Sequence, residues 1–143
     1  MTGLLSGLLA MAAIGKAETS GLKSLEPLRW DRRVVLLFAV NGEAAPAISS
    51  LRDADSSLQD RDMSWFVVED GTVVASNHDR PLDPVLGRAL TERYAPAPAP
   101  LEVLLIGKDG GVKARGPRLE LDALLGQVDA MPMRQREMRE RSD

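Results

Sequence analysis

The segment Leu101–Arg115 constrains the fold more than any other part of this chain. Its run Val103–Ile106 is apolar without interruption, which is typical of a strand that is covered on both faces. The five residues Gly107–Gly111 follow, and their Asp-Gly pair favours a tight turn with positive φ. Apolar and polar residues then alternate over Val112–Arg115, as in a half-exposed strand. The segment therefore predicts a β-hairpin with one central strand and one edge strand.

Apolar patterns elsewhere in the chain predict the remaining core elements. Val34–Val40 and Ser64–Val68 are apolar runs that predict two more strands, and the first should be central. Amphipathic spacing predicts a helix over Ala44–Leu58, Asp83-Pro84 predicts the start of another, and Leu121–Val128 predicts a third. The resulting order is β-α-β-α-β-β-α. It predicts an α/β fold with a mixed sheet, in which both β-α-β crossovers give parallel pairs and the final hairpin an antiparallel one.

Three connecting segments have weaker patterns. Leucines at a spacing of three before Trp30 predict a loop or a short helical turn that packs this tryptophan on the core. Glu69–Thr72 predicts a turn, with Val73-Val74 extended beyond it. Alternating prolines make Ala95–Pro100 extended, because each proline disfavours helix in the residue before it.

The chain contains no cysteine, and this count excludes several classes of function. Thiol catalysis, disulfide exchange and thiolate metal sites all require cysteine. The one histidine, His78, cannot form a multi-histidine metal site, so we expect no metal and no cofactor. A net charge of −3 and an aromatic content of 3% argue against nucleic acid as a partner.

The N-terminal apolar stretch Leu4–Ile14 is too short to cross a bilayer as a permanent helix. It resembles the apolar part of a secretory signal, with Gly15 and Ala17 as the small residues before a cleavage site. An ordinary amphipathic helix is the alternative, since the residues before it carry no basic side chain. We expect a signal peptide over residues 1–17, a domain over 18–131, a charged helical tail over 132–143, and a periplasmic or secreted protein.

Three stretches carry a resemblance to a known family: Arg61–Met63, Leu105–Lys113 and Asp129–Met138. Together they resemble the bacterial domain of unknown function 4174, which is similar to a module in vertebrate extracellular matrix and sushi-repeat proteins. The resemblance covers the chain from about Leu25 to Met138. It implies a thioredoxin-like three-layer sandwich, which agrees with the predicted order of elements. The family brings no established activity.

The position of the redox cysteines in thioredoxin-like proteins lies just after the first strand. Here that position is Asn41–Pro46, which contains no sulfur. Because the thiolate is the nucleophile in that chemistry, thiol oxidoreductase activity is excluded. Such folds also have a cis-proline before a later strand. Pro100 is nearest to that position, but X-Pro bonds are mostly trans and we expect trans here.

The C-terminal residues Arg134, Gln135 and Arg136 form the first candidate site. Two guanidinium groups near a helix start could bind a carboxylate or phosphate, and nearby methionines would anchor the segment. The alternative is a solvated helix. Lys108 at the hairpin tip could be a charged recognition point, whereas Asp109 beside it should only stabilise the turn.

Other polar residues give weaker candidates. His78 could be a general base oriented by Asp79, although a solvated loop histidine is the simpler interpretation. The aspartates between positions 53 and 62 should form a solvated helix face rather than a metal site.

Three classes of function remain open. The first is a non-catalytic binding module for a protein or a small anion. The second is an enzyme that uses His78, Glu43 or Arg134, which would have to meet in one cleft. The third is a structural accessory subunit of an envelope complex, which would expose a large apolar patch.

Overall fold

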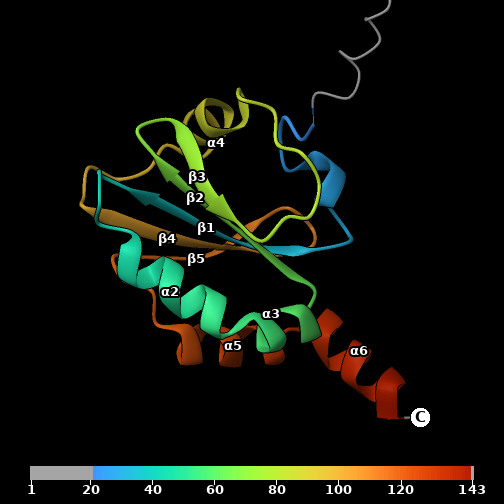
Figure 1. Ribbon diagram of the computed structural model, residues 1–143. Helices are drawn as coiled ribbons and strands as arrows, with labels where there is room; N and C mark the ends of the chain where they lie inside the picture. The colour runs from blue at the N-terminus through green and yellow to red at the C-terminus, as the bar shows by residue number, and fades with distance from the viewer. Residues whose placement is uncertain (1–20, 143) are drawn as a thin grey trace, which may run out of the picture.

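A computed structural model describes residues 21–142, which form a five-stranded mixed sheet with helices on both faces (Figure 1). The strand order is β3-β2-β1-β4-β5. The strands are β1 (Arg33–Ala39), β2 (Met63–Glu69), β3 (Thr72–Ser76), β4 (Leu101–Ile106) and β5 (Val112–Gly116). The helices are η2 (Glu26–Leu28), α2 (Ala45–Asp53), α3 (Asp55–Asp60), α4 (Leu86–Tyr94), α5 (Leu121–Asp129) and α6 (Pro132–Ser142). The predicted α/β sandwich with a mixed sheet is confirmed, and the expected signal peptide lies outside the described residues.

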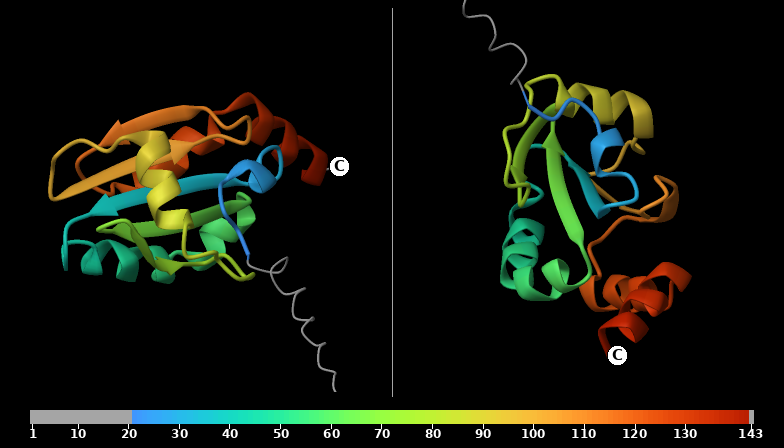
Figure 2. Two further views of the ribbon diagram at one scale, coloured as in Figure 1. Left: turned by 90° about the horizontal axis from the view of Figure 1, so that it is seen from above. Right: turned by 90° about the vertical axis from the view of Figure 1, so that its right-hand side faces the viewer.

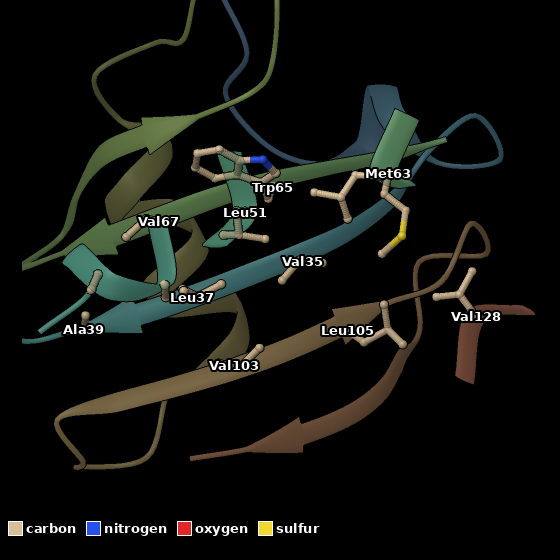
Figure 3. Packing of buried hydrophobic residues seen from close by; sticks show 13 residues of the cluster. Val35, Leu37, Ala39, Leu51, Met63, Trp65, Val67, Val103, Leu105 and Val128 are labelled. Carbon is tan, nitrogen blue, oxygen red and sulfur yellow. The ribbon is translucent and has the colours of Figure 1, made fainter. Parts of the chain in front are cut away.

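Two apolar clusters hold the three layers together. Helices α2, α3 and α5 cover one face of the sheet, and η2 and α4 cover the other (Figures 1 and 2). Side chains of β1 alternate between the faces, so that Val35 and Leu37 pack in one cluster with Trp65 and with Leu51 of α2 (Figure 3). Val34 and Leu36 face η2 and α4. Every residue of β1 is buried, which explains why its sequence is apolar without interruption after Arg33.

The strand β3 is the main difference from the predicted topology. The chain reverses at Asp70 and Gly71, whose φ angles are 51° and 77°, and β3 returns antiparallel to β2. Helix α4 therefore leads from a strand that already runs opposite to β1. As a result β4 pairs antiparallel with β1, with Val35 opposite Leu105. The prediction of a parallel pair from the second crossover is wrong, because that crossover joins β3 to β4, which are not neighbours.

Three local predictions are also corrected or refined. The helix expected over Ala44–Leu58 is divided at Ala54, where φ is −96° and ψ is 16°. Trp30 does not pack on the core, since it is 61% exposed with φ of 70° and its amide donates to the Lys108 carbonyl at 2.6 Å. No cis peptide bond occurs in residues 21–142, so Pro100 is trans as expected.

The position of α4 is fixed by close contact with the β2–β3 turn. Gly87 lies against Gly71, and a Cβ atom at Gly87 would clash with the Gly71 carbonyl. Asp83 prepares the helix start, because its Oδ1 accepts a hydrogen bond from the Val85 amide at 2.9 Å. These contacts fix α4 over the same face of the sheet that η2 covers. Of the helices within residues 21–142, none has the length and apolarity needed to cross a membrane.

Candidate functional site

The edge of the sheet that would carry a redox cysteine pair has no reactive group. Gly42 and Glu43 are exposed in the turn before α2. A groove of about 500 Å³ lies at this edge, between the ends of β1 and β2 and the segment Pro96–Pro100. Asp70 is its one charged lining residue, and Glu43 does not line it. The arrangement offers an apolar surface but no convergent polar groups for catalysis.

The C-terminal candidate residues lie in a largely buried cluster of charges, which we call the ionic network. Its members come from β1, α6 and four turns or helix ends: Arg33, Asp60, Arg61, Asp62, Lys108, Asp129, Arg134 and Glu137. Every cation in it has a carboxylate within 3.2 Å. Charged groups tolerate burial when they are paired in this way.

Glu137 is the centre of one half of the ionic network. Its Oε1 and Oε2 accept from the two terminal nitrogens of Arg33 at 3.2 and 3.1 Å, and its Oε2 accepts from Lys108 Nζ at 2.7 Å. Lys108 also donates to Asp62 at 3.0 Å. Arg33 is 1% exposed and Lys108 8%, so both cations depend on these acids rather than on water.

Arg134 is the centre of the other half. It donates to the Asp60 carboxylate at 2.9 Å and to Asp129 at 3.2 Å, while Arg61 donates to Asp129 at 2.8 Å. Arg134 is only 3% exposed. The Arg134 guanidinium group, predicted to bind a carboxylate or phosphate, is therefore already paired with two carboxylates of this chain.

The four predicted site residues thus have different surroundings. Arg134 and Lys108 are brought together in the ionic network, where each already has acidic partners. Gln135 donates to the Asp129 carbonyl, and Arg136 is exposed. Arg33 was not predicted as a site residue, although a charged residue at the start of a buried strand is a usable signal for a buried ion pair.

The electrostatics keep the carboxylates of this network ionised. Burial alone would raise the pKa of Glu137, but hydrogen bonds and charge from Arg33 and Lys108 outweigh it, so the pKa lies below 4.5. A hydrogen bond from Arg61 is the main reason that the pKa of Asp129 is lowered, and Arg134 adds to it. The network is therefore complete at neutral pH.

The ionic network also joins the three stretches that carry the family resemblance. Arg61 and Asp62 come from the first stretch, Lys108 from the second, and Asp129, Arg134 and Glu137 from the third. These stretches are distant in sequence and meet at one end of the sheet. Much of the resemblance thus concerns residues that attach α6.

A second group of arginines, which the sequence analysis did not select, surrounds a cleft of about 440 Å³ between η2, α4 and the β4–β5 turn. We call it the arginine cleft. Its apolar lining residues include Leu25, Leu28, Val34, Leu90 and Ile106, and its arginines are Arg29, Arg32 and Arg93. Two acids, Glu26 and Asp109, also line it. The Asp109 carboxylate accepts hydrogen bonds from Lys113 Nζ at 2.9 Å and from the Gly111 amide, which agrees with its expected role in stabilising the turn.

Arg32 is held in place by neutral groups. Its Nε donates to Ser64 Oγ at 3.1 Å, and its Nη2 donates to the Met63 carbonyl at 3.0 Å and to Gln59 at 3.3 Å. Within residues 21–142 no carboxylate lies in ion-pair distance of it. Arg29 contacts Glu26 only at 3.9 Å. The arginine cleft therefore has more positive charge than its own acids neutralise.

His78 lines a polar cleft of about 410 Å³ on the other side of Arg32. Its ring lies 5.9 Å from that of Phe66, and burial lowers its pKa, with Asp79 opposing this effect. Neither Glu43 nor Arg134 lines this cleft. The enzyme alternative requires His78 or Arg134 to share a cleft with Glu43, and this cleft does not provide that arrangement. In residues 21–142 no group of acids and histidine is arranged to hold a metal ion.

Comparisons with known proteins give a family and a fold. The sequence matches the family described as "Domain of unknown function (DUF4174)" over residues 24–137. No curated protein matches it significantly. The solved structures that resemble it include reduced Plasmodium vivax 2-Cys peroxiredoxin, with a TM-score of 0.52 and 15% identity over 78% of this chain and 72% of that one. Plasmodium yoelii thioredoxin peroxidase I also resembles it, with a TM-score of 0.51 and 15% identity over 78% of this chain and 79% of that one.

Identities of this size establish the fold alone. The predicted thioredoxin-like fold is thereby confirmed, while the absence of cysteine separates this chain from thiol chemistry. The family match spans most of the sequence and includes the ionic network up to Glu137. The protein belongs to the Domain of unknown function (DUF4174) family.

Proposed function

We propose that this protein is a non-catalytic binding module that acts outside the cytoplasm and takes an anionic ligand with an apolar portion in the arginine cleft. The observation that carries the proposal is the combination of unneutralised arginines with an apolar floor in one cleft. Its volume of about 440 Å³ is in the range of small-molecule sites, which is roughly 300–1,000 Å³. The edge where a thioredoxin-like enzyme would react supports no competing assignment, because it has no convergent polar groups.

The two parts of the cleft favour the two parts of such a ligand. Leu25, Leu90 and Ile106 offer an apolar surface to a hydrocarbon or apolar side chain. The arginines above them offer planar donors that suit a carboxylate. Arg32 loses little further freedom on binding, since neutral acceptors already hold it. A carboxylate beside Arg29 and Arg93 with its apolar part toward Leu90 fits this arrangement. Arg32, whose guanidinium group bonds Ser64 and Gln59 of the neighbouring polar cleft, adds positive charge behind it.

The alternative functions have less support. An enzyme of the alternative kind would need His78 or Arg134 in one cleft with Glu43, whereas His78 lines a cleft without Glu43 and Arg134 is paired with Asp60. A structural accessory subunit would need a continuous apolar patch. The exposed large apolar residues of the described chain come from five separate segments, at Trp30, Val40, Val74, Val85 and Val112.

The binding proposal is tested with three probes that share one alkyl chain: decanoate, decanol and decyltrimethylammonium. We expect two-dimensional NMR to show shifts around η2 and α4 with decanoate and weaker or no shifts with the other two. Arg93→Gln should weaken decanoate binding, whereas Arg136→Gln, the same change in charge on α6, should not. Equal binding of decanol would remove the role of the arginines. An equal effect of Arg136→Gln would favour the C-terminal candidate site instead.

The proposed compartment rests on the N-terminal sequence alone. We propose export with cleavage after Ala17, which leaves a chain that begins at Glu18. Mass spectrometry of the protein purified from its source would detect this terminus. A cytoplasmic protein that retains Met1 or Thr2 would contradict the proposal.

A further inference from the structure

The contact between Glu137 and its two cations has the form of a bound ligand. The Glu137 carboxylate meets the Arg33 guanidinium group through two parallel hydrogen bonds, and Lys108 adds a third at 2.7 Å. Two-point pairing of this kind is the usual way in which arginine recognises a carboxylate. The three donors surround a position that a carboxylate fits.

Both cations belong to the body of the domain rather than to α6. Arg33 is the first residue of β1, and its Nη1 also donates to the Arg61 carbonyl at 3.0 Å. Lys108 lies in the β4–β5 turn and is held by Asp62. The carboxylate-binding position is therefore built without α6, which supplies only the acid that fills it.

Helix α6 is attached mainly through charge. Its apolar side chains Met133 and Met138 are only half-buried and do not belong to either core cluster. Its other anchors are the ion pairs of Arg134 and the exposed contact between Arg141 and Asp60. A helix that buries little apolar surface opens more easily than a core strand. Figure 1 shows it as the outermost element at the C-terminal end.

We propose that Arg33 and Lys108 form a carboxylate-binding site, that Glu137 is its internal ligand, and that an acidic side chain of a partner protein competes with Glu137 for it. Helix α6 is then a latch that covers the site until a competing carboxylate displaces it. The partner is recognised by an acidic segment that can reach the same three donors. This site lies on the opposite face of the sheet from the arginine cleft and does not depend on the function proposed for that cleft.

The first test follows the latch in the unaltered full-length protein by hydrogen exchange and mass spectrometry. We expect amides of α6 to exchange on the order of tenfold or more faster than those of β1, because the helix opens without global unfolding. Sodium acetate should speed this exchange more than sodium chloride at equal ionic strength, since acetate competes with Glu137. If α6 is protected as strongly as β1, or if the two salts act alike, the latch is refuted.

The second test uses Glu137→Ala, with Glu140→Ala on the same helix as its matched control. The first variant should melt at a lower temperature, and acetate should raise its melting temperature more than chloride does. Acetate should give no such difference for Glu140→Ala. A synthetic acidic peptide should bind Glu137→Ala more tightly than the wild type. Absence of both acetate rescue and peptide binding would overturn the site, and if Glu137→Ala does not fold the exchange experiment still decides.

Discussion

The ionic network and the arginine cleft use the same residue type in opposite ways. Arg134 in the network is nearly inaccessible and has two carboxylates within 3.2 Å. Arg32 in the cleft is half-buried and is held only by Ser64, Gln59 and a backbone carbonyl. The decisive difference is the hydrogen-bond partner. A carboxylate neutralises the charge of a guanidinium group, whereas a neutral acceptor leaves that charge available to an anionic ligand. Arginine content alone therefore does not locate a binding surface.

The largest expected effect comes from breaking the network at Arg134. Arg134→Ala leaves Asp60 and Asp129 without that partner, and breaking a buried pair costs about 3–5 kcal/mol. We expect less here, about 1.5–3 kcal/mol, the range for hydrogen bonds to charged groups, because the Asp60 side chain is 52% exposed and keeps Arg141, while Asp129 keeps Arg61. Urea unfolding followed by circular dichroism measures it. Arg136→Ala, two residues away on the exposed side, should leave the midpoint unchanged. Equal midpoints for the two variants would show that the network does not stabilise the fold.

Acid should weaken the network next. The pKa values of Glu137 and Asp129 are lower in the folded protein than their ordinary values of 4.5 and 3.8. The stability they contribute is complete above those ordinary values and is lost as the pH falls through the lower folded values. The contribution of these two carboxylates to the unfolding free energy should thus stay level near neutral pH and fall in acid below about pH 4. The fall should be smaller in Glu137→Gln, and an identical acid profile in this variant would contradict the assignment.

The comparison also explains how far sequence reasoning reached. The strands β1, β2 and β4 were predictable because burial on both faces gives each of them a run of at least four consecutive apolar residues. The strand β3 was missed because it is a half-exposed edge with only two valines, and its omission reversed the expected direction of β4. The turn before it, Asp70-Gly71, carries the same Asp-Gly signal that predicted the β4–β5 hairpin, but the two valines after it were too short a run to predict a strand.

The candidate sites were predictable only in part, because a sequence does not show which acids reach which bases. Arg134 and Lys108 were recognised as unusual, yet their partners Asp60 and Asp62 lie at the end of a distant helix. The arginines of the cleft come from η2, the residues before β1, and α4, and no local spacing connects them. Their common surface exists only after the sheet has formed.

Charge reversal in the cleft should change binding while the fold stays intact. Arg93 is exposed at the end of α4, and its guanidinium group lies 5.4 Å from the ring centre of Tyr94. Arg93→Glu should lower affinity for decanoate by about tenfold, the factor that 1.4 kcal/mol gives. It should also raise affinity for decyltrimethylammonium, because the rim then carries an added acid. Calorimetry with both probes measures whether the variant prefers decyltrimethylammonium where the wild type prefers decanoate. Arg136→Glu is the control, and an equal loss of decanoate binding in this control would assign the effect to net charge alone.

The smallest effect should come from replacing Ser64, which does not line the arginine cleft but holds Arg32 by a hydrogen bond. Ser64 is 3% exposed, and its hydroxyl accepts from Arg32 Nε at 3.1 Å. Ser64→Ala removes that acceptor but leaves the Met63 carbonyl, so stability should fall by about 0.5–1.5 kcal/mol, the net value of one hydrogen bond. Decanoate affinity should fall a few-fold, since a less constrained Arg32 loses more freedom on binding. Calorimetry should measure decanoate affinity for Ser64→Ala and for Arg32→Lys. The two variants separate the effect of how firmly Arg32 is held from the effect of its charge. In Arg32→Lys the lysine keeps the charge but lacks the fixed planar donors, so this variant should bind decanoate more weakly than Ser64→Ala does. If Ser64→Ala loses stability but binds decanoate as the wild type does, the hydrogen bonds of Arg32 serve the fold and do not prepare a site.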